Sequence, residues 1–362
     1  MNAPSTSFAP APMYEKELKR EKLKRKINSF ILRKIDGTPL QFRLYRAYWH
    51  YKLNSNKKAI NAEFKSTHFL TQKPNYGAGI GHQLANWNSG LYFSGLFKVR
   101  FAHFPFSTAK WENFLGFGEG ELLAPPFFTD KRFKVVRLPR FNSIKKEEIQ
   151  LIGDIINSYE RPFILFLLEI DQGYVNQFDT YQLLSEKFFK AKARKNDRLI
   201  FSPEKFNIAI HIRRRMKIET EEVWKERGLN NDYYATILRK VLALLKHNKI
   251  AEVYLFSQGN INDFPEFKEF DNIHYCMDMG PEDSVLHMIN ADLLISSKSS
   301  FSYKPALISR HIQICPASFW HGYPSSSNYI LADNSGDFKK AQLSEQLYSS
   351  EKLKGIYNSK PQ

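Results

Sequence analysis

Three consecutive arginines, Arg213, Arg214 and Arg215, directly follow the short apolar stretch NIAIHI, which begins at Asn207. A guanidinium group stays charged at neutral pH and offers paired, planar donors that match the oxygen atoms of a phosphate. The apolar stretch is typical of a parallel strand, and open parallel sheets bind ligands beyond the carboxyl ends of their strands. We therefore predict a phosphate site here, with a solvated basic loop as the alternative.

A second polar cluster, SSKSSFSY at residues 296–303, lies between an expected strand and an expected helix. Its hydroxyl groups, its lysine and the unpaired N–H groups at the start of the helix all favour an anion. Capping of the helix would need one serine, whereas five are present. Two anion sites at neighbouring strand ends together indicate a ligand with two phosphates.

A third stretch, NYGAGIGHQL at residues 75–84, has glycines at the alternate positions Gly77, Gly79 and Gly81. Glycine permits a tight turn and the close approach of a ligand to a helix start, where free N–H groups favour anions. We expect a helix from this turn to about Phe97. An ordinary loop-to-helix turn is the alternative.

The order of the expected elements indicates an α/β fold. Strands that alternate with helices at this spacing form right-handed βαβ units and a parallel sheet. The expected strands are Lys134–Leu138, Pro162–Glu169, Asn207–Arg213, Glu252–Ser257, Asp292–Ser296 and Ile312–Cys315. The expected helices are Ile144–Tyr159, Tyr181–Ala193, Asn231–Lys246, Asp283–Ala291 and Ser300–Ser309.

The chain length of 362 residues predicts two domains. We expect residues 1–36 to form a disordered, then basic and amphipathic, N-terminal segment. We expect Rossmann-like domains at residues 37–203 and 204–335, followed by a C-terminal tail at 336–362. The polar junction around Pro203 separates the two domains.

Together the three motifs resemble the fucosyltransferase superfamily, which contains the α-1,2, the α-1,6 and the protein O-fucosyltransferases. HIRRR from His211 resembles the family's H-x-R-R motif, and GIGHQL from Gly79 resembles its glycine-rich turn. NADLLISSKSSFS from Asn290 resembles its last motif. The motifs occur in the family's order and spacing, between about residues 77 and 309.

The resemblance implies a GT-B architecture, in which two Rossmann-like, doubly wound domains face each other across a cleft. It implies GDP-fucose as the donor, held mainly by the C-terminal domain, so that residues 37–203 are the acceptor-side domain and residues 204–335 the nucleotide-sugar domain. It also implies inversion at the anomeric carbon without an obligatory metal or other cofactor. Arg213 matches the arginine that contacts the β-phosphate, Arg214 matches its neighbour, and Ser299 and Ser300 match the serine pair beside the diphosphate.

The catalytic residues that we predict are Arg213 and Glu221. An inverting transfer needs positive charge for the leaving diphosphate and a base for the acceptor hydroxyl. Thr220 and Glu221 have a spacing similar to the Thr-Glu pair of the α-1,6 branch, with Glu219 and Glu222 as substitutes for the base. The predicted donor-binding residues are Arg214, His211, Gly79, Gly81, His82, Gln83, Ser257, Ser299, Ser300 and Phe301.

Three positions depart from the family pattern. Met216 stands where an Asp is usual, His82 replaces an Asn, and Gln258 follows the stretch EVYLFS where an acidic residue is common. A glycosyltransferase with another nucleotide sugar, such as a different hexose or a heptose, is therefore an alternative. A catalytically silent glycan-binding relative is a further one.

The formal net charge of +16 favours anionic partners. Nucleic acid is one such partner, but we expect none because no binding module is present. Seven basic residues between Lys16 and Lys26 precede apolar residues at 27–35. This segment is typical either of a solvated helix or of a peripheral membrane contact.

Cys276 and Cys315 are too few and too far apart for a disulfide framework or a structural zinc site. The sequence has neither a transmembrane run nor the pattern of a signal peptide. We therefore expect a reducing cytoplasm, with contact at the inner membrane face. The partners we expect are a nucleotide sugar and a glycan acceptor.

Overall fold

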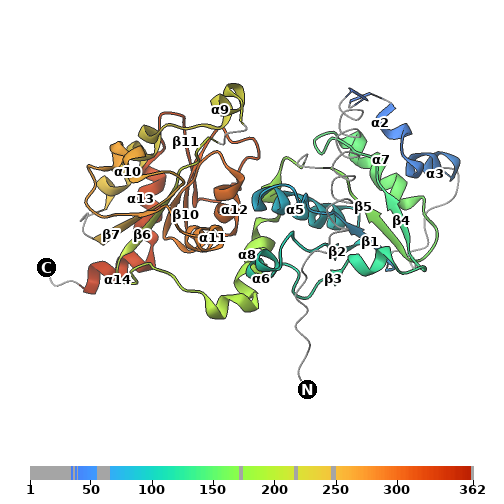
Figure 1. Cartoon of the computed structure of the whole chain (residues 1–362), viewed down its shortest axis with the longest axis horizontal. Helices are drawn as coiled ribbons and strands as arrows, with labels where there is room; N and C mark the ends of the chain where they lie inside the picture. The colour runs from blue at the N-terminus through green and yellow to red at the C-terminus, as the bar shows by residue number, and fades with distance from the viewer. Residues whose placement is uncertain are drawn as a thin grey trace, which may run out of the picture.

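The computed structural model describes residues 34–35, 37–38, 40–54, 66–170, 174–215, 219–245 and 250–359. These residues form two α/β domains that lie side by side, each built around one parallel sheet (Figure 1). The predicted fold class is confirmed, because both sheets have parallel pairings and helices connect their strands. Residues 1–33, which include the predicted basic helix, lie outside the described residues.

The first sheet has the strand order β3-β2-β1-β5-β4. Its strands are short, and residues such as Leu70, Ile164 and Phe166 are fully buried in them. The strands are β1 (His68–Thr71), β2 (Arg100–His103), β3 (Leu122–Leu123), β4 (Lys134–Arg137) and β5 (Ile164–Leu167). The helices of this part of the chain are α2 (Leu40–Arg43), α3 (Arg46–Asn54), α5 (Ile80–Leu96), α6 (Ala109–Leu115), α7 (Lys146–Asn157) and α8 (Tyr181–Lys190).

The second sheet has the order β11-β10-β9-β6-β7-β8, so β6 lies between β7 and β9. Ile208 and Ile210 of β6 face one hydrophobic cluster, while Ala209 faces another, as the alternation of side chains in a strand requires. The strands are β6 (Phe206–His211), β7 (Ala251–Phe256), β8 (Ile273–Cys276), β9 (Leu293–Ile295), β10 (Ile312–Pro316) and β11 (Tyr329–Ala332). The main helices are α9 (Glu221–Arg227), α10 (Asn231–Leu244), α11 (Pro281–Asn290) and α12 (Ser300–Ile308).

Most of the segment predicted as a C-terminal tail belongs to the second domain. It contains α13 (Lys340–Ser349) and α14 (Glu351–Ser359). Leu343 and Leu347 of α13, and Leu353 and Ile356 of α14, are buried in the same cluster as the β6 isoleucines. Spacings of three and four residues place these apolar side chains on one face of each helix, which explains why the segment packs on the sheet.

The two domains share one hydrophobic cluster. Ile80 and Trp87 of α5 and Phe188 of α8 pack in the same cluster as Val285 of α11 and Leu307 of α12. Figure 1 shows α5, α8 and α12 together at the centre of the molecule. Among the described residues, no helix has the length and apolarity needed to cross a membrane.

Candidate anion-binding site at the ends of two adjacent strands

A hydrogen bond joins the ends of β6 and β9. His211, the last residue of β6, lies with its Nδ1 2.9 Å from Oγ of Ser297, which follows β9. Burial, and to a lesser degree the charge of Arg213, lower the pKa of His211 to about 3, so the imidazole is neutral at physiological pH. The Ser297 N–H in turn donates to Oγ of Ser302 at 3.1 Å. The first bond holds the two predicted anion-binding segments against each other, and the second fixes Ser297 within its own loop.

The guanidinium of Arg213 is largely buried and, within the described part of the chain, has partners for only part of its donors. Its guanidinium forms an ion pair with Glu219, and its Cζ lies 5.6 Å from the centre of the Trp224 ring. The side chain is only 12% exposed. Its Nη1 is buried and has no hydrogen-bond partner among the described residues. A buried cationic donor of this kind is costly unless an acceptor satisfies it, and a phosphate oxygen could do so.

Arg214 makes contacts that do not overlap with those of Arg213. It donates to Oδ1 of Asn231 at 3.3 Å and to the backbone oxygen of Asp263 at 2.9 Å. Its Cζ lies 4.2 Å from the centre of the Phe264 ring. Within the described residues, the two adjacent arginines are therefore not brought onto one ligand position.

Glu221 lies at the start of α9 and is exposed. Its carboxylate forms an ion pair with Arg215, which also donates from Nη2 to the backbone oxygen of Glu219 at 3.1 Å. Thr220 caps the helix, accepting from the N–H of Val223 at 3.4 Å. An acid in the first turn of a helix is stabilised by the helix dipole, so this position has a structural explanation of its own.

The loop between β9 and α12 supplies further donors. Ser299 is the N-cap of α12, and its Oγ accepts from the N–H of Phe301 at 3.2 Å. Lys298 is only 6% exposed, and no ion pair or hydrogen bond links its ammonium to another described residue. Burial lowers the pKa of Lys298 below its usual range. Because β6 and β9 are paired neighbours, Lys298 and Arg213 follow adjacent strand ends.

Two other predicted residues support this arrangement from within the second domain. Ser257, directly after β7, donates from Oγ to the backbone oxygen of Ile212 at 2.7 Å. The Phe301 ring centre lies 5.3 Å from that of His211. Ser257 thus ties β7 to the segment that leads into Arg213, and Phe301 covers the buried imidazole.

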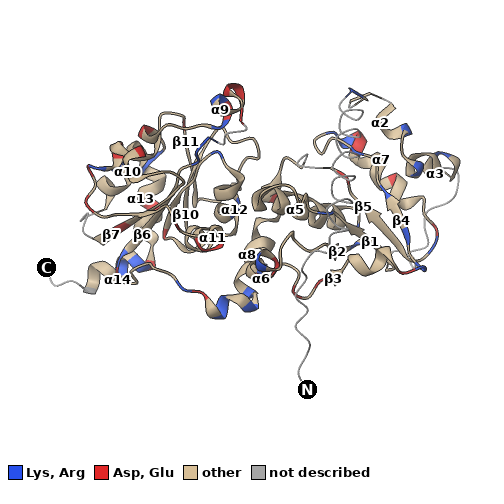
Figure 2. Cartoon of the chain, in the orientation of Figure 1, with Lys and Arg blue, Asp and Glu red and all other residues tan. Residues whose placement is uncertain are grey.

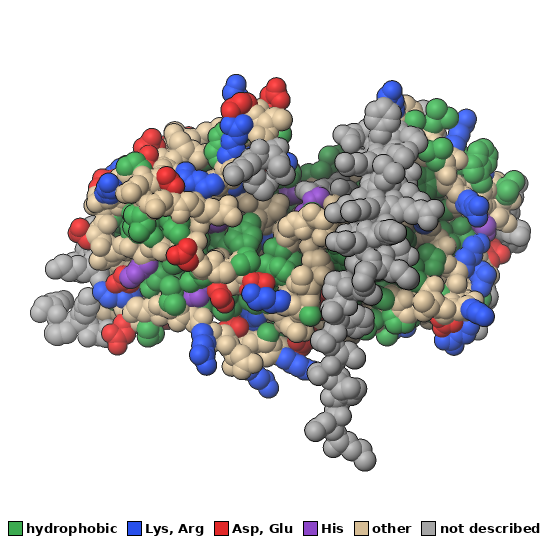
Figure 3. Space-filling model, in the orientation of Figure 1, with side chains coloured by type: hydrophobic (Ala, Val, Ile, Leu, Met, Phe, Trp, Pro, Cys, Tyr) green, Lys and Arg blue, Asp and Glu red, His purple; other side chains and the backbone are tan. Residues whose placement is uncertain are grey.

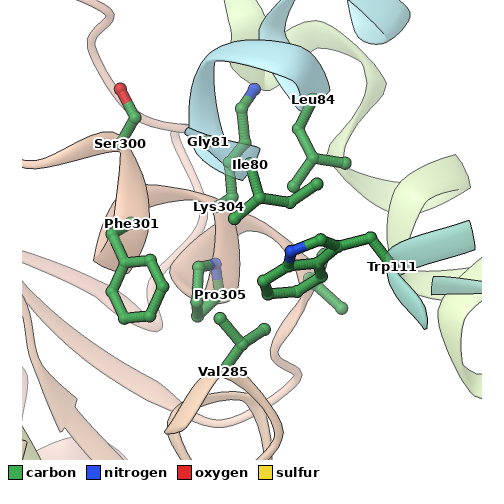
Figure 4. Close-up of a pocket in the computed structure, with 10 residues that line it drawn as sticks. Ile80, Gly81, Leu84, Trp111, Val285, Ser300, Phe301, Lys304 and Pro305 are labelled. Atoms are coloured by element: carbon green, nitrogen blue, oxygen red, sulfur yellow. The ribbon is translucent and has the colours of Figure 1, made fainter. Parts of the chain in front are cut away.

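The glycine-rich turn of the first domain meets the start of α12. Gly79 is the N-cap of α5, and Gly81 lies directly against Ser300 of α12 (Figure 4). The two helices line a narrow apolar gap together with Trp111 and Val285. Gly81 therefore serves close packing between the domains. The molecular surface is hollowed between the two domains on the side where α9 projects (Figure 3).

His82 and Gln83 follow in the first turn of α5. Gln83 is buried and uses its amide within its own domain, donating to the oxygen of Ala78 and to Oγ of Ser107, both at 2.9 Å. Its Oε1 accepts from the Ser107 N–H at 2.9 Å. Gln83 thus fixes the turn before α5, while His82 is half-buried.

The sequence did not predict the contacts of two further groups, Glu219 and Lys304. Glu219, considered only as a substitute base, neutralises Arg213 in a buried pair. Lys304 is buried in α12 and contacts Gln177 Oε1, and burial lowers its pKa to about 7. A lysine directly before the apolar residues PALI of this helix was the available signal for it. Among the described residues, no group of three or more His, Cys, Asp or Glu side chains could hold a metal ion.

The sequence matches no protein-family model and no curated protein. Distant structural similarity to GT-B glycosyltransferases is found. POFUT1 in its apo form is 12% identical over 70% of this chain and 97% of its own, with a TM-score of 0.39. WaaC, a heptosyltransferase of E. coli in complex with ADP, is 10% identical over 78% of this chain and 98% of its own, with a TM-score of 0.37. A family 9 glycosyl transferase of Veillonella parvula is 10% identical over 81% of this chain and 99% of its own, with a TM-score of 0.43.

Proposed function

We propose that this chain is an inverting glycosyltransferase that holds the diphosphate of a nucleotide sugar at the ends of β6 and β9. The observation that carries the proposal is the buried Nη1 of Arg213, which lacks a hydrogen-bond partner among the described residues. Lys298 and the start of α12 follow the adjacent strand end and add positive potential. A diphosphate offers the acceptor atoms and the negative charge that this combination lacks.

In the proposed reaction, Arg213 stabilises the negative charge that develops on the leaving nucleoside diphosphate. Glu219 holds the guanidinium when no donor is bound, and the diphosphate takes over this partner role on binding. Glu221 is the proposed base that removes the proton from the acceptor hydroxyl. Glu219 is the competing candidate, because it is buried beside Arg213, whereas Glu221 is exposed and paired with Arg215.

GDP-fucose is the proposed donor and a glycan hydroxyl the proposed acceptor, in polysaccharide assembly. This choice follows the motifs at His211, Gly79 and Asn290. POFUT1 has been described with GDP-fucose and WaaC with ADP, so both nucleotides belong in a test of the donor. An ADP-linked heptose is the competing donor.

The donor class can be tested by thermal unfolding in the presence of GDP, ADP, UDP or CMP. A ligand that binds only the folded state raises the unfolding midpoint, and at equal ligand concentration the rise is larger for the tighter ligand. We expect GDP to give the largest rise in the unaltered chain, and Arg213→Ala and Lys298→Met to lose most of it. Arg239→Ala is the matched control, because this arginine pairs with Glu269 on an exposed surface. Equal shifts in all three variants would exclude the proposed site.

Transfer itself is tested by release of GDP from GDP-fucose with a glycan acceptor. We expect Arg213→Ala to slow transfer by about two to three orders of magnitude, the usual cost of losing a stabilising donor. Glu221→Gln should abolish transfer while leaving the GDP-dependent rise intact. Loss of transfer in Glu219→Gln, but not in Glu221→Gln, would reassign the base to Glu219.

A further inference from the structure

Two helices on the first domain expose an unusual number of large apolar side chains. Leu40, Leu44, Trp49 and Leu53 are all exposed within α2, α3 and the turn between them. The indole N–H of Trp49 donates to the backbone oxygen of Arg43 at 2.8 Å, which fixes the ring beside the end of α2. We call Leu40, Leu44, Trp49 and Leu53 the apolar patch.

The four residues lie on two consecutive helices and the turn that joins them. Trp49 and Leu53 are four residues apart in α3 and so lie on one face of that helix, while Leu40 begins α2 and Leu44 directly follows it. The opposite side of α3 is occupied, because Ala47 is buried and Tyr48 and Tyr51 pack against the core of the first domain. The apolar patch is therefore additional to the residues that attach these helices to their domain.

Basic residues surround the apolar patch. The stretch from Leu40 to Asn54 contains Arg43, Arg46 and Lys52 and no acidic residue. The edge strand β4 adds Lys134, whose Nζ lies 5.0 Å from the Tyr159 ring, on which His50 of α3 is stacked at 3.9 Å. Basic residues lie along α2, α3 and β4 in Figure 2, and Figure 3 shows hydrophobic and basic side chains side by side along this edge.

We propose that the apolar patch and its basic residues form a docking surface for an anionic lipid membrane. Trp and Leu side chains that project from an amphipathic helix enter the boundary between headgroups and acyl chains, while Arg and Lys bind the anionic headgroups. Each basic residue close to such a surface strengthens binding by about fivefold. Charge complementarity therefore identifies the occupant as a membrane with negative headgroups.

A nucleic acid would use the basic residues but not the leucines. Phosphates and bases attract cations and aromatic rings, and exposed leucines gain little from either. The membrane accounts for both the charges and the aliphatic side chains, so it is the partner that the surface fits best.

The position of this surface leaves the candidate anion site open. Figure 1 shows α2 and α3 on the outer side of the first domain, away from the second sheet. Docking there would hold the protein on the membrane without covering the ends of β6 and β9. The inference is independent of the proposed glycosyl transfer, because it uses none of the residues of that site.

Co-sedimentation of the full chain with lipid vesicles tests the proposal. We compare phosphatidylcholine vesicles containing phosphatidylglycerol with vesicles of phosphatidylcholine alone, and expect binding only to the former. The double variant Leu44→Glu/Leu53→Glu should bind at least about tenfold more weakly, because it removes two inserting side chains and adds two negative charges. Its matched control is Leu331→Glu/Tyr348→Glu on the second domain.

The control pair has similar exposure: Leu331 and Tyr348 are 46% and 85% exposed, and Leu44 and Leu53 are 60% and 83% exposed. Both double variants add the same charge. Unaltered binding by the control, with loss of binding by the patch variant, supports the proposal. Equal weakening of both variants would mean that net charge alone governs binding, which would overturn it. Vesicle binding by the patch variant equal to that of the unaltered chain would also overturn it. So would a result in which the unaltered chain binds no vesicles and the patch variant differs from it only by weaker binding to DNA or RNA.

Fluorescence quenching by brominated lipid gives a second measurement that does not depend on added charges. We expect lipid-dependent quenching of tryptophan emission in the unaltered chain, lost in Trp49→Phe and retained in Trp320→Phe. Trp320 is a suitable control because it is also exposed but lies in the second domain. Retained quenching in Trp49→Phe would show that another tryptophan enters the lipid, and would contradict the proposed surface.

Discussion

Gly81 of α5 lies so close to Ser300 of α12 that a Cβ at position 81 would be 2.7 Å from the Ser300 Cβ and 2.8 Å from its backbone carbon. Atoms at such distances overlap, and the backbone of α12 has little freedom to move. Because Ser300 begins the helix that follows the proposed phosphate-binding loop, this contact couples the packing of the two domains to the geometry of the site.

Gly81→Ala should therefore destabilise the protein. The overlap with a backbone atom predicts a loss of about 1–3 kcal/mol in the free energy of unfolding, together with a smaller GDP-dependent rise in the unfolding midpoint. Gly95→Ala, in the last turn of the same helix, is the matched control, because a Cβ at position 95 would have no atom within 4 Å. It should be neutral or stabilise by up to about 1 kcal/mol. Urea unfolding of both variants measures the difference, and equal values would refute the packing argument.

The buried pair of Arg213 and Glu219 predicts an unusual response to ligand. Glu219→Gln leaves a buried guanidinium without its counter-charge, which should lower the free energy of unfolding by about 3 kcal/mol. A bound diphosphate restores that charge, so GDP should raise the unfolding midpoint more in this variant than in the unaltered chain. Glu222→Gln, at an exposed position in the next helix, serves as the control. A GDP-dependent rise that is smaller in Glu219→Gln would contradict the partner role given to Glu219.

The sequence could predict which segments meet, but not how their side chains are paired. The motifs at Arg213 and Ser297 follow buried strands, so the rule for parallel sheets placed them at one edge. The partner of Arg213 depends on the conformation of the loop that leads to Glu219, about which residue spacing says nothing. For the same reason the sequence could not show that Arg214 packs on Phe264.

Several strands and helices of the structure were not predicted from the sequence because they are short or mostly polar. The strand β1 has four residues, and β11 follows a loop without a preceding helix, so neither gave a pattern that stands out from its surroundings. The sequence of α13 and α14 is rich in polar residues. Three leucines and an isoleucine of these helices are buried in the core, and Tyr357 packs against it. Recognising those residues requires knowing which face of the sheet is uncovered.

Stability in acid should depend on His321. Burial, followed by the charge of Lys304, lowers the pKa of this imidazole to about 3 in the folded protein, against about 6.5 when unfolded. Between these pH values the unfolded chain binds a proton at His321 that the folded chain does not bind. The contribution of His321 to stability is therefore complete above about pH 6.5 and is lost as the pH falls from 6.5 to about 3. Urea unfolding at pH 7 and pH 5 should show a smaller loss in His321→Phe, whose ring can still pack against Tyr303 and Phe319. Identical losses would mean that other groups govern the acid response.

Stability at alkaline pH should depend on Lys304. Burial in α12 lowers its pKa to about 7, so the folded protein releases a proton that the unfolded chain keeps up to about pH 10.5. Stability from this residue therefore rises as the pH increases from 7 towards 10, by about 2 kcal/mol between pH 7 and pH 9. Lys304→Met keeps the volume of the side chain and removes the proton. Between pH 7 and pH 9, the free energy of unfolding of the unaltered chain should rise by about 2 kcal/mol more than that of the variant, as measured by urea unfolding. Parallel pH profiles for the two proteins would show that the Lys304 ammonium stays protonated in the folded state, held by its contact with Gln177.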